Sequence, residues 1–198
     1  MLLRNKKIGY GITGSFCTFK KMVEAVKSIS WEGAEVYPVM SEISYSTDTR
    51  FGKAVDFRQI LTDITGNTII KSVKEAEPIG PKKMFDLMIV APCTGNTLAK
   101  IANGITDTSV TMAVKAHIRN GRPVLLGVST NDALGNSARN IGALLNYKNI
   151  YFVPFEQDDY LSKPNSLVAS FDQIIPAAEA ALDGIQLQPL LLRRAVES

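Results

Sequence analysis

The sequence predicts a doubly wound α/β domain, in which a mostly parallel β-sheet carries helices on both faces. Short apolar runs alternate along the chain with longer segments of helical period. The apolar runs are continuous rather than alternating in polarity, which is typical of parallel strands buried on both sides. Glycine- and hydroxyl-rich segments follow several of these runs. Ligands bind at the carboxyl ends of the strands in such three-layer, flavodoxin-like or Rossmann-like sheets.

The composition is that of one globular domain. The 198 residues are 45% hydrophobic and 21% charged, which excludes disorder, collagen-like repeats and coiled coils. Because a domain has roughly 150 residues, the length leaves no room for two full ones. We expect a single domain over residues 1–198, with a core at about 6–154 and a C-terminal helix and tail over 155–198.

Charge and cysteine content exclude several classes of function. The 22 basic and 19 acidic residues leave a net charge of +3, and the basic residues form no stripe of the kind that binds nucleic acid. No apolar run is long enough for a membrane span, and the N-terminus has its charges after its apolar residues, unlike a signal peptide. Two cysteines and one histidine exclude a disulfide framework and a multi-histidine metal centre. We expect a cytoplasmic protein with reduced thiols.

The first half of the chain is expected to contain two strand–helix units. Gly14 ends the first apolar run, and apolar side chains from Phe16 onward follow helical spacing. Pro38 indicates a strand end or an unpaired amide in the second run. In chain order we expect a strand over residues 7–13, a helix over 15–30, a strand over 34–40, a helix over 51–64 and a short strand over 68–71.

The second half continues the alternation. Its most continuous apolar run precedes Pro92, and Gly104 separates two helical segments. Pro176 must lie near the start or at a kink of the last helix. We expect a loop over 77–81, a strand over 86–91, helices over 96–103 and 106–119, a strand over 123–128, a helix over 133–147, a strand over 150–153 and a helix over 170–182. Residues 186–198 are either a fraying tail or an interface helix.

The loop after the first strand, residues 11–15, favours an anion. Gly14 allows close backbone approach, and Ser15 can cap the following helix, whose free N–H groups and dipole attract a phosphate or a carboxylate. The loop is neither a GxGxxG fingerprint nor a P-loop. The alternative interpretation is a simple Ser15 N-cap.

The loop after the second strand, residues 40–50, is long and rich in hydroxyls, as functional loops often are. A solvated loop with a helix cap at Thr49 explains the same pattern. The candidate anion donors are Ser41, Ser44, Ser46 and Thr47, with Arg50 as a candidate cation.

Two further loops follow the third and fourth strands. In residues 91–97 Pro92 stops the strand, Asn96 or Thr97 caps the next helix, and Asn96 can orient a flat ligand. Cys93 is either a thiol of lowered pKa near that helix or an inert, semi-buried residue. After the fourth strand, Ser129 adds a hydroxyl, and Asn131 or Asp132 is expected to cap the next helix. His117 near a helix C-terminus has a structural role, through the helix dipole, rather than a catalytic one.

These loops resemble those of the homo-oligomeric flavin-containing cysteine decarboxylase family, which includes lantibiotic decarboxylases and flavin prenyltransferases. The resemblance rests on the Gly14-Ser15 loop, on Pro92-Cys-Thr-Gly-Asn-Thr97 in place of the PASANT signature, and on the stretch that continues to Asp107. It covers residues from about 6 to 154. It implies that a cofactor or ligand is bound by Thr13, Gly14, Ser15, Ser41, Ser44, Pro92, Cys93, Thr94, Asn96, Thr97, Lys100 and Ser129.

Within that family the loops are most similar to the second subunit of a two-subunit oxidoreductase of sporulating cells. This resemblance implies oxidation of a dihydropyridine-type dicarboxylate, with the NAD(P) site on the partner subunit and FMN as a candidate cofactor here. It also implies a homo-oligomer. Members that decarboxylate place a histidine after the second strand, and residues 40–50 contain none. The remaining alternatives are a non-catalytic scaffolding subunit and an FMN-dependent decarboxylase or prenyltransferase that uses another base.

Overall fold

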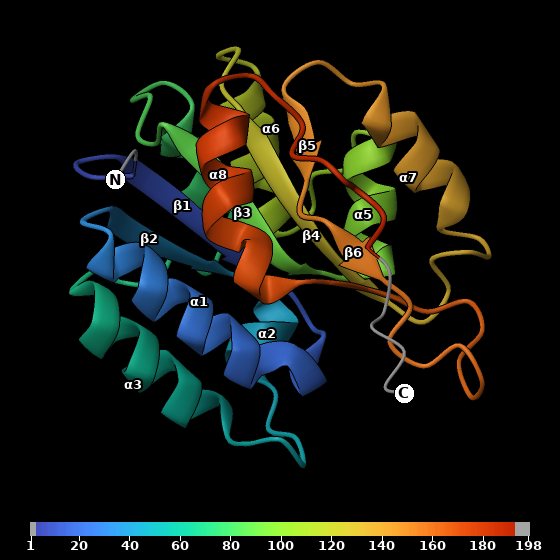
Figure 1. Ribbon diagram of the computed structural model, residues 1–198. Helices are drawn as coiled ribbons and strands as arrows, with labels where there is room; N and C mark the ends of the chain where they lie inside the picture. Colours follow the sequence, from blue (N-terminus) through green and yellow to red (C-terminus); the bar gives the residue numbers. More distant parts are fainter. Residues whose placement is uncertain (1–2, 193–198) are drawn as a thin grey trace.

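The computed structural model describes residues 3–192 and is built on one seven-stranded sheet (Figure 1). The strand order is β2-β1-β3-β4-β7-β6, with β5 also pairing with β4. The strands from β1 to β5 pair in parallel, whereas β6 and β7 pair in antiparallel fashion. The strands are β1 (Lys7–Ile12), β2 (Glu35–Met40), β3 (Leu87–Cys93), β4 (Val124–Thr130), β5 (Ile150–Phe152), β6 (Phe155–Glu156) and β7 (Leu167–Ala169).

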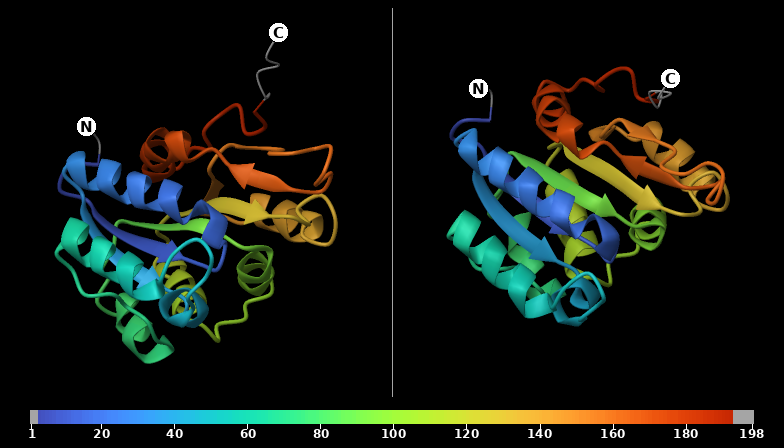
Figure 2. Two further views of the ribbon diagram at one scale, coloured as in Figure 1. Left: turned by 90° about the horizontal axis from the view of Figure 1, so that it is seen from below. Right: turned by 60° about the horizontal axis from the view of Figure 1, so that its bottom comes forward.

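Helices cover both faces of the sheet, which confirms the predicted doubly wound, three-layer class (Figure 2). Helices α1 and α8 pack on one face, with α3 outside α1, while α4 to α7 lie on the other. The helices are α1 (Phe19–Trp31), α2 (Glu42–Ser46), α3 (Ala54–Thr65), α4 (Val73–Ala76), α5 (Gly95–Ala102), α6 (Ser109–Ile118), α7 (Ala138–Leu145) and α8 (Ile174–Leu182). Three short 3-10 turns are η1 (Phe16–Thr18), η2 (Glu77–Ile79) and η3 (Phe171–Gln173).

The two buried faces explain why the central strands are apolar throughout. In β3, Leu87 and Ile89 pack into the core beneath α1 and α8, whereas Met88 and Val90 pack into the core beneath α6. All seven residues of β3 are buried. Side chains of successive strand residues point to opposite faces, so a strand covered on both sides needs an apolar residue at every position.

One buried polar group in this core is unsatisfied. Tyr10 of β1 is fully buried, and its hydroxyl makes no hydrogen bond to another residue within 3–192. Burial raises the pKa of this phenol. A buried hydroxyl without a partner costs about 1–3 kcal/mol.

We therefore expect Tyr10→Phe to stabilise the protein by about 1 kcal/mol, because the variant removes the unsatisfied oxygen and keeps the ring. Urea unfolding followed by circular dichroism measures the change. Tyr147→Phe is the control, because the hydroxyl of Tyr147 donates to the carbonyl of Ala102 and its loss offers no such gain. A destabilised Tyr10→Phe variant would contradict the prediction.

The antiparallel part of the sheet is absent from the sequence prediction. Strands β6 and β7 are two and three residues long, and they are separated by a turn-rich stretch. Runs this short show no period. Strand β6 pairs with β7, and β7 pairs with the end of β4, about forty residues earlier in the chain. The predicted strand over 68–71 is also reduced to a single bridge between Ile70 and Val39.

The C-terminal segment docks on the sheet as far as it is described. The amide of Gln186 bonds both the N–H and the carbonyl of Phe152, and Leu191 bridges to Phe155. Residues 186–192 are thus neither a fraying tail nor a helix, and the rest of that predicted segment lies outside the described residues. Pro176 falls in the first turn of α8, where its missing N–H costs no hydrogen bond.

Candidate functional site at the carboxyl ends of the strands

The loops that follow β1, β3 and β4 meet at one edge of the sheet, because these strands are parallel neighbours. Thr13 joins two of them. Its Oγ1 donates to the carbonyl of Pro92 at 2.7 Å and accepts from the N–H of Thr94 at 3.0 Å. Pro92 does not end the strand as expected, since β3 continues to Cys93 with a register shift after Val90. Thr13 therefore fixes the β3 loop against the β1 loop.

Ser15 lies at the centre of this edge rather than at a helix cap. Its Oγ is 2.8 Å from Oγ of Ser129, which lies near the end of β4 and 114 residues away along the chain. The predicted capping role is wrong, because Ser15 makes no side-chain cap bond and α1 begins only at Phe19, after the turn η1. The structure thus brings together two hydroxyls of the predicted set in one pair.

Gly14 lies beside this pair, and the packing of the chain does not require a glycine at this position. A Cβ at Gly14 would lie 3.5 Å from Ile43 and 3.7 Å from Phe16, which is ordinary contact, and the backbone is not left-handed there. The Gly14 N–H makes no hydrogen bond within residues 3–192. The loop therefore presents a free backbone donor next to two hydroxyls, an arrangement suited to an anion.

In the second loop the hydroxyls of Ser41 and Ser44 face inward, whereas Ser46 is exposed and its hydroxyl donates to the carbonyl of Glu42. Ser41 caps α2, and its Oγ donates to Oγ of Ser44 at 3.0 Å. Ser44 is fully buried, and its hydroxyl donates to the carbonyl of Ile12 at 2.9 Å. Both side chains hold the loop against the end of β1. The alternative cap at Thr49 is not formed, because the first turn of α3 is bonded by Asp48, whose Oδ1 accepts from the N–H of Ala54.

The third loop enters α5 through a cap that the sequence prediction misplaced. Thr94, not Asn96 or Thr97, is the N-cap, and its Oγ1 accepts from the Thr97 N–H at 3.3 Å. Thr97 is 7% exposed, and its hydroxyl accepts a hydrogen bond from the hydroxyl of the N-cap residue Thr94. Asn96 is exposed, and its side chain makes no hydrogen bond within the described part of the chain. Asn96 is therefore free to contact a ligand.

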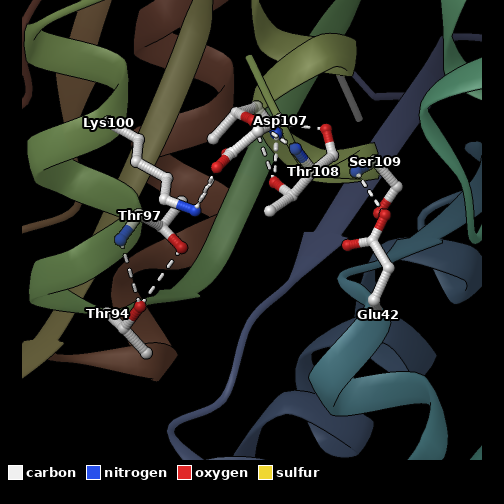
Figure 3. Close-up of polar contacts among 8 residues, drawn as sticks. Glu42, Thr94, Thr97, Lys100, Asp107, Thr108 and Ser109 are labelled. Carbon is white, nitrogen blue, oxygen red and sulfur yellow. Dashed lines mark hydrogen bonds and ion pairs between the residues drawn. The ribbon is translucent and has the colours of Figure 1, made fainter. Parts of the chain in front are cut away.

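Lys100 of α5 is held by an ion pair (Figure 3). Its Nζ lies 2.8 Å from Oδ1 of Asp107, and this contact lowers the pKa of the Asp107 carboxyl. Next to it, α6 begins with a capping box between Thr108 and Thr111, and the Ser109 N–H donates to Glu42 of α2. Lys100 thus orders the connection between α5 and α6.

The fourth loop forms a hollow of about 530 Å³ beside the start of α5. Asp132 is not the N-cap of the next helix. Helix α7 begins at Ala138, and its N-cap position is Ser137, which makes no side-chain cap bond. Instead, Asp132 Oδ1 accepts hydroxyl bonds from Thr130 at 2.6 Å and from Ser137 at 2.9 Å. These hydrogen bonds lower the pKa of the Asp132 carboxyl, and the bond from Thr130 has the larger effect. The hollow is lined by Thr94, Gly95, Asn96, Ala99, Thr130, Asp132, Asn136, Ser137, Arg139 and Asn140.

Gly95 is the position at which the hollow demands a glycine. A Cβ there would lie 2.7 Å from Thr130 Oγ1, 2.8 Å from Ser137 Oγ and 2.9 Å from Asp132 Oδ1. The start of α5 can therefore approach the Asp132 cluster only without a side chain. Asn136, Arg139 and Asn140 are absent from the predicted site. The sequence signal for these three residues is the polar run over residues 129–140. A solvated loop followed by the start of a helix has the same pattern.

A larger groove of about 1070 Å³ runs between α1, α3 and the start of α8. None of the predicted site residues lines it. We place the candidate site at the strand ends, because the free donors and acceptors gather there. Among residues 3–192 no group of three or more His, Cys, Asp or Glu side chains is arranged for a metal ion. None of the described helices is long and apolar enough to cross a bilayer.

The two thiols differ in accessibility. Cys93 is fully buried, and burial raises its pKa to about 12, so the inert interpretation holds and a reactive thiolate is excluded. Cys17 is exposed, and it lies just after the loop over residues 11–15, here called the anion loop.

We expect Ellman's reagent to titrate one thiol in the native protein and two after unfolding in guanidinium. Cys17→Ser should remove the native reaction, whereas Cys93→Ser should leave it unchanged. Rapid reaction of a second thiol in the folded protein would contradict the assignment.

The comparisons agree with this architecture. The family model "Flavoprotein" matches residues 2–166, and the chain therefore belongs to the flavoprotein family. Within it, the chain is 48% identical over 190 residues to the B subunit of dipicolinate synthase from Bacillus subtilis, covering 96% of this chain and 95% of that protein. A crystal structure of the dipicolinate synthase B subunit from Bacillus halodurans superposes with a TM-score of 0.90 at 44% identity, covering 98% of this chain and 100% of that one.

More distant structures share the fold. The FMN-dependent cysteine decarboxylase SpaF superposes with a TM-score of 0.67 at 19% identity, over 92% of this chain and 99% of that one. At this identity the likeness defines the flavodoxin-like architecture and not the ligand.

Proposed function

We propose that this chain is the B subunit of a dipicolinate synthase and works with an A subunit to oxidise a dihydrodipicolinate-type precursor to pyridine-2,6-dicarboxylate. The observation that carries the proposal is the 48% identity to the dipicolinate synthase B subunit across nearly the whole of both chains. The strand-end loops support it, since they gather free polar groups suited to a small anionic ligand. We place the protein in the cytoplasm of a sporulating cell, as a homo-oligomer.

The anion loop fits the phosphate of FMN. Gly14 offers a free N–H and room for close approach, and Ser15 and Ser129 offer two adjoining hydroxyls. Thr13, Ser41 and Ser44 would then act indirectly, by holding the surrounding loops in place. When bound, FMN supplies a hydride acceptor.

Conversion of a dihydropyridine ring into a pyridine removes one hydride and one proton. We propose that NAD(P) on the A subunit receives the hydride in the end, and that this chain binds and orients the dicarboxylate. Asn96 could contact a planar ligand, since its amide is free and its side chain lines the hollow.

The decarboxylase alternative lacks an acid–base histidine at the strand ends. The single histidine of the chain, His117, is buried, and its Nε2 bonds the Pro123 carbonyl at the opposite ends of the strands. The scaffolding alternative leaves unexplained why so many polar groups at this edge are free.

The test is reconstitution of the purified chain with its A subunit, NAD(P) and the precursor. We expect a product with the ultraviolet absorption of dipicolinate, formed only when both subunits are present. An A subunit that forms dipicolinate equally fast alone would refute a catalytic role and favour scaffolding. A yellow protein that releases carbon dioxide from a peptidyl cysteine would favour the decarboxylase.

A further inference from the structure

Basic side chains gather at the amino-terminal ends of the parallel strands, opposite the candidate site. The loops that precede β1 to β5 lie side by side there, because parallel neighbours begin at the same edge of the sheet (Figure 1). The Asn5 N–H donates to the carbonyl of Gly33, and Arg122 donates to the carbonyl of Lys83. We call this surface the basic edge, and it comprises residues 3–7, 32–35, 80–86, 119–123 and 146–149.

The basic edge is more positive than the chain as a whole. It contains eight basic and three acidic residues, a net charge of +5, whereas the whole chain has +3. Two of its acids are in ion pairs, Glu35 with Lys7 and Asp86 with Arg122. The other basic side chains of the edge, which make no ion pair within residues 3–192, are Arg4, Lys6, Lys82, Lys83, Arg119 and Lys148. Folding therefore gathers basic residues that are scattered along the sequence.

Helix dipoles explain only part of this charge. Arg119 and Lys148 follow the carboxyl ends of α6 and α7, where a cation interacts favourably with the dipole. Lys82 and Lys83 follow only the short turn η2, so no long helix ends beside them. The two lysines need another explanation.

Lys83 occupies a backbone position that favours glycine. Its φ is +47°, in the left-handed region, where a Cβ crowds the backbone. Its ammonium group makes no hydrogen bond or ion pair to any residue that the structure describes. A cation that stands at a strained position and has no partner within the described chain indicates a role toward something outside it.

Exposed aromatic rings accompany these cations. Trp31, the single tryptophan of the chain, ends α1 immediately before the basic edge and is 83% exposed. Tyr147, beside Lys148, is 47% exposed. Tryptophan and tyrosine are enriched where a membrane meets water, because their rings are partly apolar and partly polar.

We propose that the basic edge binds the surface of a membrane that contains anionic phospholipids. The cations contact the lipid phosphates, and the ring of Trp31 enters the headgroup layer. Binding is peripheral, and the candidate site at the opposite edge of the sheet faces away from the lipid. This inference is independent of the proposed function.

The composition of the basic edge favours lipid over two other anionic partners. Five of its eight cations are lysines. Lysine is depleted in protein–protein interfaces, whereas lysine clusters are typical of surfaces that bind anionic lipids. Duplex DNA is read by helices or strands that enter a groove, and the basic edge presents short loops instead.

Trp31 reports binding without a label, because the chain contains no other tryptophan. The full chain is titrated with vesicles of equal parts phosphatidylglycerol and phosphatidylcholine, and its fluorescence is recorded. We expect the emission maximum to move to shorter wavelength. The shift should be absent with pure phosphatidylcholine and should disappear in about 1 M salt, where charges are screened within about 3 Å.

The double variant Lys82→Gln, Lys83→Gln tests the cations. It should weaken binding to the anionic vesicles about 30-fold, because each lysine close to such a surface adds to the affinity. The double variant Lys20→Gln, Lys21→Gln is the matched control. These two exposed lysines lie at the start of α1, at the opposite edge, and their loss should leave vesicle binding unchanged.

Lys83→Gly separates the charge from the fold. Glycine suits the left-handed backbone, so the urea midpoint should be no lower than that of the wild type. Vesicle binding should nevertheless fall about fivefold.

An unchanged emission maximum with the anionic vesicles, or equal losses in the two double variants, would overturn the proposal. Binding to a DNA duplex but not to vesicles would also overturn it and assign the basic edge to nucleic acid. A smaller oligomer of the Lys82, Lys83 variant in gel filtration would assign it to a contact between copies of this chain. A protein that binds the vesicles but has no synthase activity would leave this inference standing and refute the proposed function.

Discussion

Ser15→Asp is expected to lower the affinity of the protein for FMN about 100-fold or more. The aspartate would place a negative charge where the proposed phosphate lies, beside Ser129 and the free N–H of Gly14. Two unit charges about 4 Å apart near a protein surface repel each other by about 4 kcal/mol. Titration of FMN fluorescence measures the loss.

Two variants control this experiment. Ser15→Ala removes one hydroxyl without adding charge and should weaken FMN binding about tenfold. Ser162→Asp adds the same charge on an exposed loop and should leave binding unchanged. Since Ser15 is partly exposed and caps no helix, the substitution should not unfold the protein. Wild-type affinity in Ser15→Asp would show that the phosphate binds elsewhere.

Acidification is expected to remove about 3 kcal/mol of stability through His117 alone. His117 is 1% exposed, and burial lowers its pKa from 6.5 to about 4. A lowered folded-state pKa means that the unfolded chain binds the proton first. The stabilisation is complete above about pH 6.5, declines as the pH falls, and is lost once the pH passes about 4.

His117→Gln is the matched control, because glutamine can still donate to the Pro123 carbonyl but does not titrate. Urea unfolding of both proteins between about pH 7 and pH 4 isolates the histidine, since the carboxylates are common to both. We expect the free energy of unfolding of the wild type to fall by about 3 kcal/mol more than that of His117→Gln across this range. Parallel pH profiles would contradict the buried, neutral histidine.

The neutral state of His117 also corrects the reason for its position. A charge–dipole interaction with the end of α6 requires the protonated ring. Because the Pro123 carbonyl can only accept, Nε2 carries the proton of a neutral ring. The structural role predicted for this residue is therefore confirmed, but it comes from a buried hydrogen bond.

Local pattern was sufficient for the parallel part of the sheet and for most of its covering helices. The apolar run of β3 and the helical spacing of α1 and α6 are properties of neighbouring residues, so they are visible in the sequence. The loops that follow the strands were also identified correctly as the polar edge. Helix starts were less accurate, since Ser15, Asn96 and Asp132 are all plausible caps that the folded chain uses otherwise.

The site itself depends on contacts between distant segments. The Ser15–Ser129 pair joins residues 114 positions apart, and the hollow forms only because Gly95 lets α5 approach Asp132. Burial likewise decides that Ser44 and Cys93 are enclosed while Asn96 and Arg139 are free. The order of residues thus predicted one domain with a ligand-binding edge, through periodicity and loop chemistry. Which side chains meet at that edge was decided by the packing of parallel strands and their helices, because distance in space is independent of distance along the chain.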